Sequence, residues 1–223
     1  MVTKTTFKQY LQEAEEKMTP AKDIYDLLAS LKSGYFTKDG SKLKVTGNFN
    51  CDNNQLKSLE GCPQTVGGSF NCSDNKLKSL EGCPRTVNGS FWCVNNQLES
   101  LEGCPQKVGG NFACGHNQLE SLEGCPQTVG GDFYCWNNEK LTSLARINFY
   151  VHETNGAADG ANFSGCPIKS NVLGILKIRG LKKVKFDDKK LEEIMNKYLP
   201  MGDSTDCIDD LLDAGYSKEY CKW

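Results

Sequence analysis

VGGSFNCSDNKLKSLEGCPRT, residues 66–86, recurs along this chain almost unchanged. The next copy, residues 87–107, reads VNGSFWCVNNQLESLEGCPQK, and residues 108–128 read VGGNFACGHNQLESLEGCPQT. Flanking copies begin at Val45 and Val129, so the period is 21 residues (87 − 66). A fixed period of this length is typical of solenoids, in which each repeat forms one coil and buries its apolar side chains against its neighbours.

Each unit begins with an alternating segment, VxGxFxC, which predicts a seven-residue strand. In residues 66–72, alternation places Val66, Phe70 and Cys72 toward the core and Asn71 toward solvent. Two leucines and a Gly-Cys-Pro bend complete the unit. One asparagine stands at a fixed position between the strand and the leucines, and its side-chain amide can bond the turn backbone. The sequence therefore predicts a ladder of five stacked amides: Asn54, Asn75, Asn96, Asn117 and Asn138.

Nine of the twelve cysteines lie in two columns at the repeat period: Cys51, Cys72, Cys93, Cys114 and Cys135 in one, and Cys62, Cys83, Cys104 and Cys125 in the other. Disulfides or a metal site are alternatives for so many cysteines. The sequence has no CxxC pair, however, and its N-terminus lacks the apolar segment of an export signal. We therefore expect reduced thiols packed in the core, with no metal and no cofactor.

The N-terminal residues 1–34 predict two short helices. Their apolar stripes are Phe7, Tyr10, Leu11 and Ala14 in the first, and Ile24, Leu27, Leu28 and Leu31 in the second. We expect these helices to cover the first coil, because a terminal coil has no neighbour to bury its face.

The repeat pattern decays after Asn138, where Glu139 and Lys140 shift the next leucine by one position. Residues 154–165 predict an inserted loop, and residues 172–178 repeat the VxGxFxC spacing with aliphatic side chains. Two further helices are predicted beyond them. Asp187 or Asp188 can cap the first, which carries Leu191, Ile194, Met195 and Tyr198, and Asp206 can cap the second, which carries Ile208, Leu211 and Leu212.

The predicted fold is an α/β solenoid of about seven coils, five regular, one degenerate and one terminal. It has a parallel β-sheet face and helical caps at both ends. Its parts are an N-terminal helical cap (1–44), the regular repeats (45–144), degenerate repeats with the inserted loop (145–178) and a C-terminal helical cap (179–223).

The strand, turn asparagine and two leucines of FNCSDNKLKSL resemble the leucine-rich repeat LxLxxNxLxxL, with Phe and Cys in place of the first two leucines. Over residues 45–144 the VxGxFxC…LxSLEGCP variant resembles tandem-repeat proteins encoded by large tailed bacteriophages. More distantly it resembles bacterial leucine-rich-repeat effectors, which have leucine-proline where this chain has GCP. The resemblance implies a leucine-rich-repeat-like solenoid encoded by a phage, and a partner protein in the host cytoplasm. A host defence protein inhibited by occlusion is one such partner.

Catalytic motifs are absent from the sequence: it has neither GxxxxGK[ST] nor HExxH, and its only histidines are His116 and His152. His116 stands two residues after Cys114, but alternation points Cys114 inward, away from solvent. We therefore predict that the chain is not an enzyme.

The formal net charge is −2, so we expect no nucleic-acid partner, and no stretch of 18 apolar residues predicts a membrane span. These features predict a cytoplasmic location. A basic run between Lys177 and Lys190 could hold phosphate or an acidic surface, but nearby acidic residues favour a solvated face.

Outward positions that vary between copies predict the binding site. The central position of the strand reads Asn50, Asn71, Trp92, Ala113 and Tyr134 in successive copies, and Ala113 with Gly115 should leave a shallow notch. Trp and Tyr are typical anchors of protein interfaces. We predict partner binding by Asn50, Asn71, Trp92, Val94, His116, Asp132, Tyr134 and Trp136. Alternatives are that a cap or the loop covers these rings, that a nucleotide or sugar binds between Trp92 and Tyr134, and that the chain is a self-assembling structural component of a phage.

Overall fold

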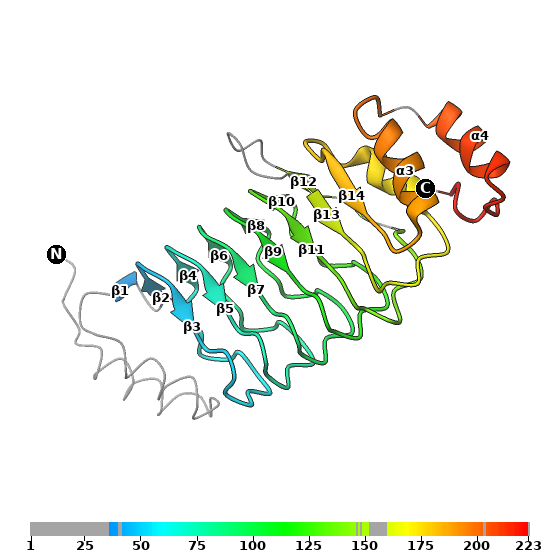
Figure 1. Cartoon of the computed structure of the whole chain (residues 1–223). Coiled ribbons are helices and arrows are strands. Elements are labelled where there is room, and N and C mark those ends of the chain that lie inside the picture. The colour runs from blue at the N-terminus through cyan, green and yellow to red at the C-terminus, as the bar shows by residue number, and fades with distance from the viewer. Residues whose placement is uncertain are drawn as a thin grey trace.

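The chain forms a parallel β-solenoid of about six turns (Figure 1). This computed structural model describes residues 36–39, 42–145, 147, 149–151, 160–202 and 204–222. The predicted helices of residues 1–34 lie outside the described residues. Successive coils follow one another along a single axis, and two helices lie at the C-terminal end (Figure 1).

Each regular coil contributes one short strand to each of two seven-stranded sheets. The first sheet, sheet A, contains β1 (Phe36–Asp39), β2 (Lys42–Val45), β4 (Thr65–Val66), β6 (Thr86–Val87), β8 (Lys107–Val108), β10 (Thr128–Val129) and β12 (Tyr150–Val151). The second, sheet B, contains β3 (Phe49–Asn50), β5 (Phe70–Asn71), β7 (Phe91–Trp92), β9 (Phe112–Ala113), β11 (Phe133–Tyr134), β13 (Gly160–Asn162) and β14 (Lys183–Lys185). Neighbouring strands are parallel, except that β1 pairs with β2 in the antiparallel direction.

The prediction of one seven-residue strand in each unit, and so of a single sheet face, is wrong. The VxG segment ends in sheet A and FxC begins in sheet B, because the chain turns a corner at the glycine. A Cβ atom on Gly89 would lie 2.7 Å from the carbonyl carbon of Gly68 in the preceding coil. Glycine at this position therefore lets the backbones of neighbouring coils approach closely at the corner.

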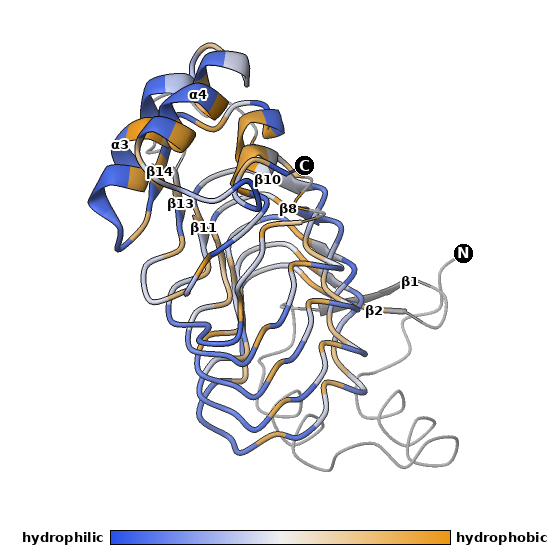
Figure 2. Cartoon of the chain, turned by 90° about the vertical axis from the view of Figure 1, so that its right-hand side faces the viewer, coloured by the Kyte–Doolittle hydropathy of each residue, from blue (hydrophilic) through white to orange (hydrophobic). Residues whose placement is uncertain are grey.

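The core consists of side chains stacked in columns along the solenoid. Phe49, Phe70, Phe91, Phe112 and Phe133 form one column of stacked rings, with neighbouring centroids 5.3 to 5.9 Å apart. Val66, Cys72, Leu77 and Leu80 are also fully buried, as are their equivalents in the next coil. Hydrophobic and hydrophilic segments alternate around each coil (Figure 2). The predicted inward residues are thus confirmed.

The predicted asparagine ladder is confirmed from Asn75 onward. The Asn96 side-chain oxygen accepts a hydrogen bond from Leu77 N in the preceding coil at 3.0 Å. Its amide nitrogen donates to the carbonyls of Cys72, Cys93 and Val94 at 3.0 to 3.3 Å. One buried amide therefore satisfies turn backbone in two neighbouring coils.

All twelve cysteines are free thiols, and ten of them are buried. In the second column, Cys83 Sγ donates to Gly103 O at 3.0 Å and Cys104 Sγ to Gly124 O at 2.9 Å, each in the following coil. Burial raises the pKa of Cys83 to about 12. These thiols therefore pack as small core residues with an internal hydrogen bond.

The C-terminal coils depart from the prediction. Residues Val172–Lys177 form a 3-10 helix, η1, where we predicted the strand of a seventh coil. Four consecutive residues from Val172 to Ile175 are buried, which an alternating strand does not allow. The last strand of sheet B is instead β14, inside the segment predicted to be entirely a helical cap.

Two of the predicted helices are present after β14. Helix α3 (Lys189–Tyr198) begins at Asp188, whose carboxylate accepts from Lys190 N and Leu191 N, so this predicted N-cap is confirmed. Helix α4 (Thr205–Asp213) has Ser204 as its N-cap, two residues before Asp206, which lies in the first turn, so the predicted cap at Asp206 is wrong.

Candidate binding surface

The outer face of sheet B brings the predicted central column together. Strand register pairs Asn50 with Asn71, Asn71 with Trp92, Trp92 with Ala113, and Ala113 with Tyr134. We call the outward residues of this sheet, together with the residues that follow each strand, the strand face. The predicted residues Val94, Asp132 and Trp136 flank the same column on neighbouring positions of their coils.

Trp92 is the prominent apolar side chain of the strand face. It is 36% exposed, and the other exposed large hydrophobic residues in the described ranges, Met201 and Leu212, lie near the C-terminal helices. Its neighbour Ala113 is only 2% exposed. The Trp92 carbonyl accepts from Cys72 N at 2.9 Å, so its backbone is held by the preceding coil while the side chain remains accessible.

Tyr134, Trp136 and His116 form an aromatic cluster on the same face as Trp92, with Ala113 between Trp92 and Tyr134 in the column. The Tyr134 and Trp136 rings meet edge to face with centroids 5.4 Å apart, and His116 meets Trp136 likewise at 6.4 Å. Tyr134 donates its hydroxyl to Asp132 Oδ2 at 2.6 Å, and this bond to the carboxylate raises the pKa of Tyr134 to about 12. Asp132 Oδ1 also accepts from Gly160 N, so the cluster is anchored to β13. The rings are therefore held in place before any partner binds.

The shallow notch predicted at Ala113 and Gly115 is not formed. A Cβ atom on Gly115 would lie 2.6 Å from the Trp136 indole. The indole therefore occupies the space that the glycine leaves, and Gly115 itself is buried. Gly115 seats Trp136 rather than opening a recess.

Asn50 and Asn71 have a structural role that the sequence analysis missed. Each side-chain oxygen accepts from the backbone N–H two residues later, that of Asp52 or Ser73. Asn162 makes the same bond to Ser164 N in β13. The recurrence of asparagine at this register position was the available signal, since asparagine forms such local turns.

His116 lies at the edge of the strand face, in the turn after sheet B. Its backbone φ is 52°, and the equivalent residues of the other coils are also left-handed. Asn and Asp tolerate that conformation better than most residues. This exposed column, which the sequence analysis did not single out, contains Asn53, Asp74, Asn95, His116 and Asn137.

Cys114 and His116 do not make a nucleophile and base. The Cys114 thiol is fully buried, and burial raises its pKa to about 11, whereas His116 is exposed. A catalytic thiol needs an accessible thiolate. No cluster of metal-ligating side chains occurs in the ranges that the structure describes.

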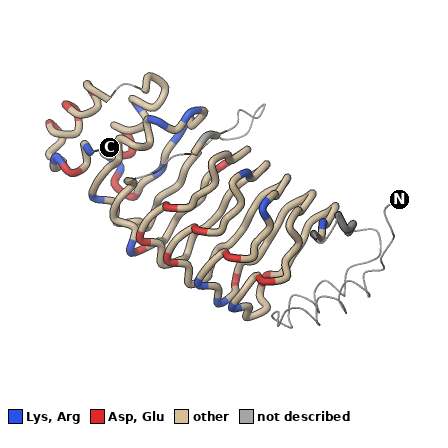
Figure 3. The backbone as a smooth tube through the Cα atoms, turned by 180° about the vertical axis from the view of Figure 1, so that it is seen from behind, with Lys and Arg blue, Asp and Glu red and all other residues tan. Residues whose placement is uncertain are grey.

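Charges at the C-terminal end are of both signs (Figure 3). Lys189 pairs with Glu192 at 3.3 Å, and Lys190 donates to the carbonyl of Ala214. Lys183 and Lys185 are exposed on either side of the buried Val184 in β14. Within the predicted basic run, Lys189 and Lys190 therefore have acceptors of their own, whereas Lys183 and Lys185 face solvent.

Across the described ranges, every helix is too short or too polar to cross a membrane. Comparison with family models, with curated proteins and with solved structures finds no match to this chain.

Proposed function

We propose that this chain is a non-enzymatic binding protein that recognises another protein through the strand face. The observation that carries the proposal is that the exposed Trp92 shares one face with the anchored cluster of Tyr134 and Trp136, two coils away. Large aromatic side chains contribute much of the binding energy of protein interfaces. Because these residues stand on a hydrogen-bonded sheet, they lose little conformational freedom on binding.

We further propose that the solenoid is leucine-rich-repeat-like, closed by helices at both ends, and encoded by a large tailed bacteriophage. The repeat resemblance supports this origin, and the turn asparagines followed by buried leucines support the repeat class. The partner is then a cytoplasmic protein of the host, and a defence protein occluded by the bound solenoid fits a rigid, non-catalytic surface.

A nucleotide or sugar held between Trp92 and Tyr134 is a weaker second candidate. These residues lie two coils apart, about 10 Å at the spacing of parallel strands, which is too wide for one ring to stack on both. The Trp136–Gly115 contact also removes the notch that such a ligand would enter.

The test is capture of a partner from a lysate of the bacterial host, with three forms of the full chain. The double variant Trp92→Ala, Trp136→Ala should lose the partner and keep its cooperative unfolding. Leu212→Ala is the matched control, because Leu212 is a similarly exposed apolar residue at 39%, but on α4. Retention by the double variant would contradict the proposal, as would an equal loss by the Leu212 variant. Self-association of the wild-type chain at the strand face, without a host partner, would favour a structural component.

A further inference from the structure

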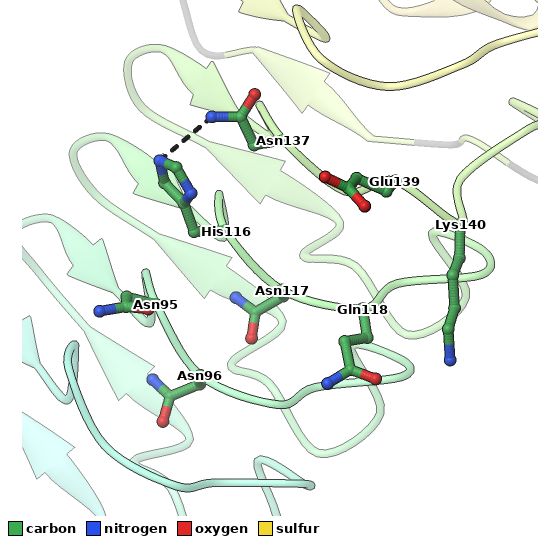
Figure 4. Close-up of a pocket in the computed structure, with 8 residues that line it drawn as sticks. All are labelled: Asn95, Asn96, His116, Asn117, Gln118, Asn137, Glu139 and Lys140. Carbon is green, nitrogen blue, oxygen red and sulfur yellow. Dashed lines mark hydrogen bonds between the residues drawn. The ribbon is translucent and has the colours of Figure 1, made fainter.

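A polar depression crosses the turns of three consecutive coils, next to the strand face. It has a volume of about 680 Å³ and is shown in Figure 4. Asn95, His116 and Asn137 follow one another along one side, one from each coil, and the remaining lining residues come from the chain just after them (Figure 4). Those residues are Asn96, Asn117, Gln118, Glu139 and Lys140.

The fifth coil, which contributes Asn137, Glu139 and Lys140 to the depression, carries one extra residue between Asn138 and Leu141. In earlier coils the residue after the ladder asparagine donates its N–H to a leucine carbonyl of the preceding coil, as Gln118 N does to Leu98 O at 2.9 Å. In the fifth coil two residues, Glu139 and Lys140, stand where the earlier coils have one, and this pattern is broken. Leu141 N instead donates to Asn138 O of its own coil at 3.0 Å. Within the described ranges, no backbone N–H continues the series to the Leu119 carbonyl. The fourth and fifth coils stay joined just before this point, by the parallel bridge between Asn117 and Asn138 and by Leu119 N, which donates to Asn138 Oδ1 at 3.2 Å, so the irregularity is confined to the residues that follow Asn138.

The lining favours a neutral ligand with many hydroxyl groups. Asn95, His116, Gln118 and Asn137 are exposed and carry amide and imidazole groups, which both donate and accept hydrogen bonds. Asn95 Nδ2 donates to Asp74 Oδ1, and Asn137 Nδ2 is bonded to His116 Nε2 at 3.1 Å (Figure 4), so a ligand would meet the remaining donors and acceptors of these groups. Glu139 and Lys140 have opposite charges, and Lys140 also lies 3.6 Å from Glu120. The depression thus has no net cationic character for a phosphate chain, and no apolar wall for a hydrophobic ligand.

The spacing of these groups selects the ligand further. Coils joined by parallel strands lie about 4.8 Å apart, whereas an extended peptide advances only about 3.3 Å per residue and falls out of step. One pyranose ring of an extended chain is about as long as one coil spacing. We propose that the depression binds a neutral β-1,4-linked oligosaccharide that runs along the solenoid axis, with one sugar ring over each of three coils.

This site adjoins the strand face at His116, but the variants that test it change none of the residues changed in the strand-face test, so either proposal can fail without the other. The first measurement is calorimetric titration of the full chain with cellotetraose and chitotetraose, both β-1,4-linked and extended. Maltotetraose, whose α-1,4 links make the chain curl, is the geometric control. We expect saturable one-to-one binding of a β-1,4 probe, with maltotetraose at least tenfold weaker. No binding of either β-1,4 probe at millimolar concentration would overturn the proposal, and so would equal binding of maltotetraose.

Variants then locate the site. Deleting Lys140 restores the regular spacing and removes a lining side chain. Glu139 N should then donate to the Leu119 carbonyl as in the earlier coils, and binding should fall at least tenfold while the chain remains folded. Asn95→Gly removes a lining amide and keeps the left-handed backbone, and should also weaken binding several-fold. The matched control is Asn53→Gly at the equivalent turn of the first coil, where φ is 52° and binding should not change. Unchanged binding by Asn95→Gly, or equal weakening by Asn53→Gly, would overturn the assignment even if the deletion variant failed to fold.

Discussion

Asn96 shows how a single side chain joins two coils. Its amide is buried and makes four hydrogen bonds to turn backbone, so Asn96→Ala leaves several buried groups without partners. We expect the free energy of unfolding to fall by about 1–3 kcal/mol, measured by urea denaturation. Asn54→Ala is the control, because Asn54 is exposed and its amide nitrogen donates within its own turn, to Asp52 O. Equal losses for the two variants would contradict a role for the ladder.

Because of the buried thiols, we expect the free energy of unfolding to fall at alkaline pH. The pKa of Cys114 is raised from an ordinary value near 9 to about 11, because burial disfavours the thiolate. Between these values the folded chain keeps a proton that the unfolded chain has lost. Stability should therefore be complete below pH 9 and fall as the pH rises from 9 to 11, by up to about 1.4 kcal/mol per pH unit for such a thiol.

Urea midpoints at pH 7, 9, 10 and 11 test this dependence. Cys114→Ala should flatten the decline, whatever it does to stability at pH 7. Val108→Ala is the control, since Val108 is equally buried in the same coil and does not titrate. An unchanged slope in Cys114→Ala would show that other groups cause the alkaline loss.

At the scale of strands and helices, the repeat pattern predicted the asparagine ladder and the buried positions of each coil, but it did not predict the corner within the coil. The 21-residue period identified the ladder, and alternation placed Phe70 and Cys72 in the core. The corner at Gly68 was missed, because the two-residue alternation continues through it and only the glycine marks the bend. The strand at residues 172–178 was wrong because aliphatic spacing alone does not distinguish a strand from the buried 3-10 helix η1.

The candidate site was also predictable only in part, because the repeat pattern shows which residues face outward but not how their side chains are oriented. Variation between copies identified Trp92, Tyr134 and Trp136 on one face, and strand register confirms that Trp92 and Tyr134 share a column. The seating of Trp136 on Gly115 joins residues one repeat apart, and it depends on how the indole turns. A one-letter pattern carries no information about that orientation. The effect of the extra residue at Glu139-Lys140 likewise appears only when neighbouring coils are stacked.

Helix α3 protects the last strand of sheet B. Asn196 Oδ1 accepts from Val184 N and its Nδ2 donates to Val184 O, both at 2.8 Å, as a further strand would. An unpaired strand edge invites pairing with another chain. Asn196→Ala should therefore lower the free energy of unfolding by about 1–3 kcal/mol and increase self-association, measured by urea denaturation and sedimentation velocity. Glu193→Ala, an exposed change on the same helix, should do neither. A monomeric Asn196 variant would show that the edge is protected by other means.

For the whole molecule, the stacked columns imply stability that grows coil by coil. Each regular coil pairs with the coils before and after it, and equivalent residues meet at a constant register of 21 positions, as Phe70 meets Phe91 and Asn71 meets Trp92. Solenoids of this kind behave as a sum of repeats and of contacts between neighbours. A whole unit can therefore be removed without altering the contacts of the coils on either side.

Removing residues 66–86 tests this directly, because Thr65 then continues into Val87 and Phe49 meets Phe91 in the same register. We expect a folded chain with a lower free energy of unfolding. The slope of that free energy against urea concentration should also be smaller, because unfolding exposes the surface of one coil fewer. Trp92, Tyr134, Trp136 and the depression lie beyond the deletion, so partner capture should persist. Removing residues 108–128 instead takes away Gly115 and His116, and should abolish both the seat of Trp136 and the depression. Unfolding of the first deletion variant would contradict the additive behaviour of the coils. Unchanged binding by the second would show that function is not confined to the third, fourth and fifth coils.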